Sequence, residues 1–286
     1  MSDDKSPAIG SPLEISVDVD LARRLVAQQF PQWADLSMEP IANQGWDNRT
    51  FRLGNAMSIR LPSARDYAEQ VQKEQLWLPK LAPYLPVAIP RTLAMGKPGL
   101  SYPWHWSIYR WIEGDVASAE SITDSCQLAY DLGSFLVALQ QIDASEGPAA
   151  GAHNFHRGGS LAIYDSQMQQ AIARLQDKMH VTAVRTMWTE ALSSVWQQAP
   201  VWVHGDVAVG NMLLDHGRLC GVIDFGCCAV GDPASDLVVA WTLFSGKSRE
   251  LFRSILPYDD LTWRRARGWA LWKTLILHTG IINGPS

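Results

Sequence analysis

The sequence predicts an α+β fold with two lobes, a small N-terminal lobe built on a β-sheet and a larger, mainly helical C-terminal lobe. Three observations support this class. The chain has 286 residues, more than one small hydrophobic core requires. Its composition, 47% hydrophobic and 19% charged, excludes an intrinsically disordered chain. Strand patterns with one strong helix come first, and helical patterns dominate afterwards.

The boundary between the lobes is expected near residues 109–114. Glu113 and Gly114 interrupt the pattern there, before the long helical segments begin. We therefore expect an N-terminal lobe over 1–108, a connection over 109–114 and a C-terminal lobe over 115–286.

The elements expected in the N-terminal lobe alternate between helix and strand. The first 16 residues have no periodicity and are expected to form a frayed tail. Then follow a helix over 18–30, a β-hairpin within 38–60 that turns at Gly54-Asn55, a helix over 66–81, and extended segments at 86–90 and 107–109 around a loop rich in Gly, Pro and Trp.

The C-terminal lobe is expected to be helical with one strand-rich insert. Helices are predicted over 121–142 and 161–196, with a looser stretch at 144–160 between them, a strand-rich insert at 201–224 and further helices to the end.

The insert carries the most informative motif, VWVHGDVAVGNMLLDHGRLCGVIDFG at 201–226. A short buried strand leads into His204-Gly205-Asp206, and Asn211 follows five residues after Asp206. Two apolar strands then flank a turn sequence, and the second strand ends at Asp224. Since Asn211 opens the first strand and Asp224 closes the second, both should lie at the open end of one antiparallel hairpin.

Asp206 lies on the loop that leads to the same end of the hairpin. Two carboxylates and an amide oxygen should therefore converge there, with few basic residues nearby to neutralise them. Hard oxygen ligands of this kind suit Mg²⁺, which takes one or two carboxylates together with phosphate oxygens and water. The alternative is that Asp206 and Asn211 only cap turns while Asp224 ends a strand.

An Asp that accepts a hydroxyl proton, an Asn, and the Asp of a D-F-G triplet are also the parts of protein-kinase active sites. HGDxxxxN, IDFG, Gly231-Asp232-Pro233 and Asp236-Leu237 together resemble the aminoglycoside phosphotransferase family, kinase relatives that phosphorylate small hydroxylated molecules. The similarity covers most of the chain, from about residue 18 to the end. It implies a bilobal protein-kinase-like fold.

The resemblance also implies roles for individual residues. Asp206 would be the catalytic base, and Asn211 and Asp224 the magnesium ligands. Asp236 would be a buried structural residue that holds the catalytic loop, and His204 would bond to the backbone near the metal loop. One departure is notable: many relatives carry His-Pro between the Asp and the Asn, whereas this chain has Val-Ala-Val-Gly at 207–210, which lacks a polar side chain beside the base.

Kinase-like catalysis also needs a cation on the donor phosphates, held by a helix carboxylate. Glu74 lies on the apolar stripe of the helix over 66–81, where a carboxylate requires a partner. Arg60, on the preceding strand, is the expected partner in place of the usual Lys, and Arg52 could share the phosphate contact. The alternative is a surface salt bridge between the lobes.

The rest of the nucleotide site is expected in the turn 43–50 and in the lobe connection. No G-x-G-x-x-G or G-x-x-x-x-G-K-[ST] motif is present, so Gly45 and Asn48 are the candidates to cover the phosphates through backbone N–H groups. An ordinary turn is the alternative. Tyr109 and Trp111, in the segment 108–112, are expected beside the nucleobase; ATP and GTP are both open as donors.

The acceptor cannot be named from motif or fold. Acidic walls would suit a cationic aminosugar, and apolar walls a macrolide-type acceptor. The candidates are mixed: Asp232, the loop 153–159 and the indoles of Trp241, Trp269 and Trp272, for which a core position is the alternative.

The leading hypothesis is therefore a Mg²⁺-dependent O-phosphotransferase that moves the γ-phosphate of ATP or GTP to a hydroxyl of an aminoglycoside, another antibiotic or a hydroxylated metabolite; the family name suggests antibiotic resistance. The alternative is a catalytically weak, nucleotide-binding pseudokinase that serves as a binding or regulatory module. A metal-dependent hydrolase is disfavoured, since H-E-x-x-H and G-x-S-x-G are both missing from the sequence.

Composition limits the partners and the location. A net charge of −5 argues against nucleic-acid binding through phosphate contacts. No apolar run is long enough to span a membrane, and the polar, acidic start of the chain resembles neither a secretory signal nor a transit peptide. Four cysteines without a C-x-x-C pair fit reduced thiols. We expect a cytoplasmic protein, and a monomer is the default.

Overall fold

The computed structural model describes residues 17–42, 44–45 and 47–281. It separates into two compact units: Met1–Lys80 with Pro90–Ile112, and Leu81–Ile89 with Glu113–Gly284. The expected frayed tail lies outside the described residues. That the connection spans 109–114 stays a prediction.

The segment 81–89 belongs to the second unit, although the sequence placed it in the first. The reason is backbone pairing. Ala88 donates to the carbonyl of Cys220 at 3.0 Å and accepts from the N–H of Val222 at 2.9 Å. These two hydrogen bonds attach the segment to a strand more than 130 residues later in the chain, a contact that no local pattern indicates.

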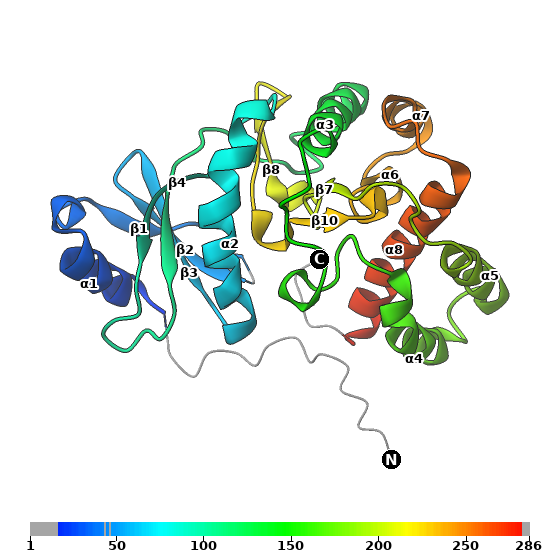
Figure 1. The fold of residues 1–286 in the computed structure, drawn as a ribbon, viewed down its shortest axis with the longest axis horizontal. Coiled ribbons are helices and arrows are strands. Elements are labelled where there is room, and N and C mark those ends of the chain that lie inside the picture. The colour runs from blue at the N-terminus through cyan, green and yellow to red at the C-terminus, as the bar shows by residue number, and fades with distance from the viewer. Residues whose placement is uncertain (1–16, 43, 46, 282–286) are drawn as a thin grey trace, which may run out of the picture. The chain divides into compact units, whose positions relative to one another are not determined.

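The first unit is an antiparallel five-stranded sheet with two helices (Figure 1). The strand order is β1-β2-β3-β5-β4. The elements are α1 (Val19–Gln29), β1 (Met38–Pro40), β2 (Asn48–Leu53), β3 (Met57–Pro62), α2 (Arg65–Leu81), β4 (Arg91–Gly96) and β5 (Trp106–Arg110), with a short 3₁₀ turn after α1.

The two faces of this sheet differ in polarity. Side chains alternate along a strand, so Ile59 of β3 and Ile108 of β5 lie on one face, where they form a buried core with Leu25 of α1. On the other face Gln75 of α2 donates to the hydroxyl of Ser107 at 3.0 Å. The first face therefore supplies stability, and the second presents polar groups to α2.

Strand β4 lies where the sequence predicted a loop. It pairs with β5, and Gly96 at its end makes room for an indole, since a Cβ there would lie 2.0 Å from the ring of Trp106. Pairing with a neighbour and a close packing contact, rather than a strong local pattern, define this strand.

The second unit is mainly helical with two small sheets, which order the strands as β6-β8-β9 and β7-β10. Its elements are β6 (Asp115–Val116), α3 (Ser125–Gln140), α4 (Asp165–Leu175), α5 (Val181–Leu192), β7 (Val201–Val203), β8 (Met212–Asp215), β9 (Arg218–Val222), β10 (Ala229–Gly231), α6 (Val239–Thr242), α7 (Gly246–Ile255) and α8 (Asp260–Thr279), joined in places by 3₁₀ turns.

Helix α8 is the central helix of this unit, and it packs against α4 and α5. Its N-terminus is capped by Asp259, which accepts from the N–H of Thr262 at 2.8 Å, and it ends at Gly280 in the left-handed conformation. No helix in the described part of the chain is both long and apolar enough to cross a membrane. The α+β class, with an N-terminal sheet and a helical C-terminal part, is confirmed.

Candidate active site

The loop that carries Asp206 is held by a buried carboxylate. Asp236 accepts the backbone N–H groups of His204 at 2.7 Å and Gly205 at 2.8 Å. Burial raises the pKa of Asp236 to about 6, so near neutral pH the carboxylate is ionised and can accept both bonds. The expected structural role of Asp236 is confirmed.

Gly205 is required at the turn of this loop. Its φ is +84°, and a Cβ there would lie 2.3 Å from the carbonyl oxygen of Cys227. A side chain would therefore meet both an unfavourable backbone conformation and a backbone clash. With any residue other than glycine at position 205, the loop could not approach the segment after Asp224 this closely.

His204 connects the loop to the end of β9. Its Nδ1 accepts from the backbone N–H of Asp206 at 3.2 Å, which leaves Nε2 as the donor to the carbonyl of Ile223 at 3.0 Å. Its ring also packs edge-on against Phe225. The histidine is structural, as the resemblance implied.

The hairpin β8–β9 brings the predicted site residues to one end. The N–H of Ile223 donates to the carbonyl of Asn211 at 2.9 Å, so Asn211 and Asp224 flank the open end. The Asn211 Nδ2 donates to the backbone carbonyl of Asp206 at 2.9 Å and to its Oδ2 at 3.3 Å. The expected hairpin geometry is confirmed, while the chemical roles of the three residues stay predictions.

Asp224 adopts a left-handed backbone conformation, with φ 67° and ψ 66°. Asp tolerates this region better than most residues, yet the conformation is uncommon outside glycine and often marks functional sites. The described residues contain no group of three or more His, Cys, Asp or Glu side chains placed for a metal. A cation here would therefore need Asn211 and ligand oxygens besides Asp224.

Two cations lie beside Asp206, and the sequence expectation of few basic neighbours is wrong. The Lys273 Nζ of α8 is 3.1 Å from Asp206 Oδ1, and Arg157 lines the same pocket. Burial alone would raise the pKa of Asp206, but the charges of Lys273 and Arg157 and a hydrogen bond from Lys273 hold it below its usual value. The carboxylate is therefore ionised near neutral pH.

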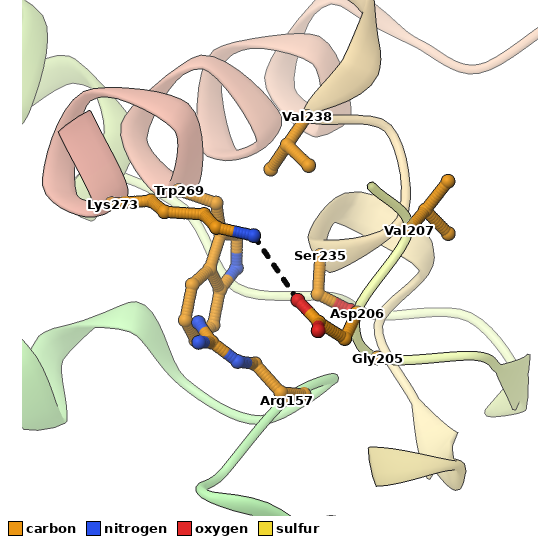
Figure 2. Close-up of a pocket in the computed structure, with 8 residues that line it drawn as sticks. All are labelled: Arg157, Gly205, Asp206, Val207, Ser235, Val238, Trp269 and Lys273. Carbon is orange, nitrogen blue, oxygen red and sulfur yellow. Dashed lines mark hydrogen bonds and ion pairs between the residues drawn. The ribbon is translucent and has the colours of Figure 1, made fainter. Parts of the chain in front are cut away.

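A small pocket lies directly at Asp206 (Figure 2). Figure 2 shows Lys273 and Trp269 approaching it from α8, with Arg157 on a separate loop below them. The lining residues are Arg157, Gly205, Asp206, Val207, Ser235, Val238, Trp269 and Lys273.

Sequence reasoning missed both cations. Arg157 lies in the loop 153–159 that was a candidate for acceptor binding, so its basic side chain was a usable signal. Lys273 follows Trp272 in the last helix, 67 positions after Asp206, and only the packing of α8 brings it to the site.

Asp232 is not available as an acidic wall for an acceptor. Its carboxylate is buried and forms a 2.7 Å ion pair with Arg265, and it also accepts the N–H of Ala234. Of the three indoles considered for the acceptor, Trp269 and Trp272 are each 1% exposed, as the core alternative predicts, and only Trp269 also lines the pocket. Trp241 is partly exposed and stacks edge-on with Trp263.

In the first unit, Glu74 of α2 and Arg60 of β3 form the expected ion pair, with 3.5 Å between Oε1 and Nη1. Sequence reasoning did not anticipate the third member, Tyr109, whose hydroxyl donates to Glu74 Oε2. Burial and the Glu74 charge raise the pKa of Tyr109, so it remains a donor. Because Tyr109 is only 2% exposed, its side chain is enclosed and supports Glu74, while the place of this segment beside the nucleobase stays a prediction.

The other predicted nucleotide residues are placed differently from one another. Gly45 is exposed and its carbonyl accepts from Arg49 at 3.1 Å, whereas Asn48 is buried at the start of β2. Trp111 donates its backbone N–H to Ala56, so that group is already used. The Arg52 guanidinium lies 4.3 Å from the Trp111 ring centroid and bonds to the β2–β3 turn.

An antiparallel sheet unit, a mainly helical unit and a β8–β9 hairpin with Asp206, Asn211 and Asp224 near its open end are together typical of kinase-like phosphotransferases. The model of the Phosphotransferase enzyme family matches residues 38–269, so the chain belongs to that family. The resemblance drawn from the motifs and the expected enzyme class are thereby confirmed.

A curated relative and several solved structures are similar to the chain. An aminoglycoside 3'-phosphotransferase of Escherichia coli is 28% identical over 128 residues, which cover 43% of this chain and 44% of that protein. The match thus spans less than half of the relative.

Among solved structures, the GDP complex of wild-type aminoglycoside 2'-phosphotransferase-IIIa has a TM-score of 0.71 at 19% identity, with 93% of this chain and 92% of that chain covered. The apoenzyme of a macrolide 2'-phosphotransferase from Brachybacterium faecium has a TM-score of 0.61 at 24% identity, covering 92% and 94%. A ternary complex of an aminoglycoside phosphotransferase with streptomycin and ATP has a TM-score of 0.56 at 19% identity, with 93% of this chain and 95% of that chain covered. At these identities the likeness establishes the fold.

Proposed function

We propose that the protein is a Mg²⁺-dependent O-phosphotransferase that transfers the γ-phosphoryl group of ATP or GTP to a hydroxyl group of a small molecule. The observation that carries the proposal is the open end of the β8–β9 hairpin. There Asn211 bonds to Asp206 while Asp224 closes the neighbouring strand. Membership in the phosphotransferase family supports the same reaction.

Asp206 would accept the proton of the acceptor hydroxyl. Its lowered pKa keeps it ionised and makes it a weak base, which suits a reaction with a loose transition state in which positioning and charge stabilisation matter most. Asn211 bonds to Oδ2 and Lys273 to Oδ1, so the plane of the carboxylate is fixed. An oriented carboxylate can direct the hydroxyl towards the phosphorus atom.

Asn211 and Asp224 would hold the magnesium ion. The Asn211 amide nitrogen makes both hydrogen bonds to Asp206, which leaves its oxygen for a cation. The Asp224 side chain is only partly buried, and a carboxylate with an amide oxygen is a donor set that Mg²⁺ accepts. When bound, the ion would neutralise charge on the phosphate oxygens.

In the first unit, Arg60 would bind donor phosphates, and Glu74 would orient it. The guanidinium keeps its charge at any physiological pH and offers a planar set of donors to phosphate oxygens. Tyr109 holds the other oxygen of Glu74, so the carboxylate is fixed from two sides. Gly45, Asn48 and the segment around Trp111 remain candidates for the rest of the nucleotide contact.

The donor and the acceptor are proposed by class. Structures of the same fold are complexes with GDP and with ATP, which supports a nucleoside triphosphate donor. Neighbours are named as aminoglycoside and macrolide phosphotransferases, and one is a complex with kanamycin. An antibiotic or a hydroxylated metabolite is therefore the proposed acceptor class.

The test is nucleotide turnover with and without Mg²⁺. We expect release of ADP or GDP, and EDTA should abolish it. The substitution Asp206→Asn should slow this release about 10² to 10⁴-fold, since a positioned base contributes that much. Asp215→Asn, an exposed aspartate in the turn of the same hairpin, is the matched control and should retain full activity. If Asp206→Asn binds nucleotide and turns over as fast as the wild type, the pseudokinase alternative stands instead.

A further inference from the structure

Three residues that line the pocket beside Asp206 each have a buried polar atom without a hydrogen-bond partner. The atoms are Arg157 Nε, Ser235 Oγ and Trp269 Nε1, each lacking a partner within the described residues. Ser235 is 4% exposed and Trp269 only 1%. Buried polar atoms are nearly always paired, so three such atoms around one pocket indicate a place reserved for a ligand group.

All three atoms belong to groups that can donate a hydrogen bond. The guanidinium Nε–H and the indole N–H can only donate, and the Ser235 hydroxyl can do so as well. Lys273 adds an ammonium group, and the single carboxylate of the lining, Asp206, is already paired with it. The pocket therefore presents hydrogen-bond donors and a positive charge, which is complementary to an anionic oxygen group.

Arg157 is held in place before any ligand arrives. Its guanidinium carbon lies 4.6 Å from the ring centroid of Trp272 and 5.4 Å from that of Trp269. The Asn154 amide donates to the Arg157 carbonyl at 2.7 Å, and Gly158 accepts from the N–H of Asp232 at 2.7 Å. Among the described residues no carboxylate forms an ion pair with Arg157, and Asp206, the one carboxylate of the lining, faces both Arg157 and Lys273, so the pocket keeps a net positive charge.

We infer that the pocket binds a carboxylate group of the phosphate acceptor, with Arg157 as the principal contact and Ser235 and Trp269 as further donors. This inference rests on the proposed phosphotransferase function and narrows its substrate class to hydroxylated molecules that carry an acidic group. The open space within the pocket is about 10 Å³, enough for one water-sized group, so one oxygen of the carboxylate would enter it and the remainder of the acceptor would lie outside. A planar carboxylate matches the guanidinium fork.

The same charges disfavour a polycationic aminosugar at this position. An ammonium group placed in the pocket would meet both Arg157 and Lys273, and like charges at short range repel. It would also leave the Trp269 N–H and the Arg157 Nε–H without an acceptor. The pocket is thus unlike the acidic wall that a cationic acceptor requires.

The binding test uses formate, the smallest carboxylate, and does not depend on turnover. Sodium formate replaces sodium chloride at constant ionic strength, and thermal unfolding is recorded for the wild type and for Arg157→Met. At ten times its Kd, formate should raise the wild-type Tm by about 3 °C in a saturable manner. The rise should disappear in Arg157→Met and persist in Arg264→Met, an exposed arginine on α8.

Ser235→Ala is the second variant, because it removes one small donor with little change in packing; it should weaken formate binding several-fold. An equal Tm response of the wild type and both pocket variants, or stabilisation by methylammonium chloride instead of formate, would overturn the inference. Nucleotide turnover of the wild type is measured separately. A protein that turns over nucleotide but is not stabilised by formate would contradict this inference alone, whereas a protein without turnover would contradict the proposed function.

A matched set of acceptors extends the test to catalysis. Glucuronate, glucose and glucosamine share a ring and differ in carrying a carboxylate, no charge or an amine. The rate of nucleoside diphosphate release, corrected for the rate without acceptor, gives kcat/KM for each sugar. This value should be highest for glucuronate, lower for glucose and lowest for glucosamine. Arg157→Met should remove the advantage of glucuronate, a loss of roughly tenfold or more that appears mainly in KM. A preference of the wild type for glucosamine contradicts the inference.

Discussion

The two oxygens of Asp206 have different partners, and this asymmetry describes the site at the scale of single residues. Oδ1 receives the Lys273 ammonium at 3.1 Å, and Oδ2 receives the Asn211 amide at 3.3 Å. Many members of the family carry a polar residue between the Asp and the Asn, where this chain has Val-Ala-Val-Gly at 207–210. Lys273, from a distant helix, supplies a polar neighbour that the loop itself lacks.

Replacement of Lys273 by Met should raise the pKa of Asp206. The ammonium is among the charges that hold that pKa below its usual value, whereas burial acts in the opposite direction. The change can be measured by NMR titration of the carboxyl carbon, assigned with Asp206→Asn. Lys247→Met, an exposed lysine on α7, is the control and should leave the titration unchanged.

The same titration has a consequence for stability. A carboxylate whose pKa is lowered in the folded state stabilises the protein above its unfolded value of about 3.9, and this contribution is lost as the pH falls through the folded pKa. In Lys273→Met the contribution should become smaller. An Asp206 titration identical in the wild type and the variant would show that the ion pair has no influence in solution.

At the scale of secondary-structure elements, short connections rather than helices position Asp206 and Arg157. The loop after β7 is held by Asp236, and it can approach the residues after β9 because Gly205 has no side chain. The loop with Arg157 is fixed in a similar way, since a Cβ on Gly231 would lie 2.1 Å from the carbonyl oxygen of Gly158. Contacts between backbones thus set the positions of Asp206 and Arg157.

Gly205→Ala should destabilise the protein by roughly 2–4 kcal/mol, because a positive φ and a backbone clash act together. Gly210→Ala in the same segment is the matched control, since a Cβ there meets nothing within 4 Å, and its effect should stay within about 0.5 kcal/mol. Urea unfolding of the two variants checks the difference. Equal stabilities would mean that the loop can move away from Cys227 at no cost.

At the scale of the whole molecule, each compact unit depends on polar contacts that connect distant parts of the chain. In the second unit, Arg265 of α8 reaches Asp232 after β10 and also donates to Ser194 after α5. Both members of the ion pair are buried, at 5% and 6% exposure. This pair connects the last helix, which carries Lys273, to the segment that follows β10.

Arg265→Met should lower the free energy of unfolding by about 3–5 kcal/mol, because it leaves the Asp232 carboxylate buried without a counter-charge. The double variant Asp232→Asn with Arg265→Met should recover part of the loss, since no lone charge remains. Arg267→Met, exposed on the same helix, should have little effect. A single variant as stable as the wild type in chemical denaturation would contradict this account.

The sequence predicted well those features whose residues are near one another along the chain. The hairpin with Asn211 and Asp224 at its open end spans few residues, so strand alternation and a turn sequence sufficed to place them. Glu74 and Arg60 were likewise paired correctly, because an inward carboxylate needs a partner and the adjacent strand offered one. The motif that joins these parts also predicted the family.

Residues brought together by packing were not predictable in this way. Lys273, Arg157 and the enclosed ring of Tyr109 reach their partners only through the arrangement of helices and strands, and Ala88 joins a strand of the second unit through two backbone bonds. Local pattern therefore determined the reaction class, because its groups share one hairpin and its loop. Tertiary structure decided the charge around Asp206, and with it the inferred acceptor, because electrostatic fields depend on distance in space and not on distance along the chain.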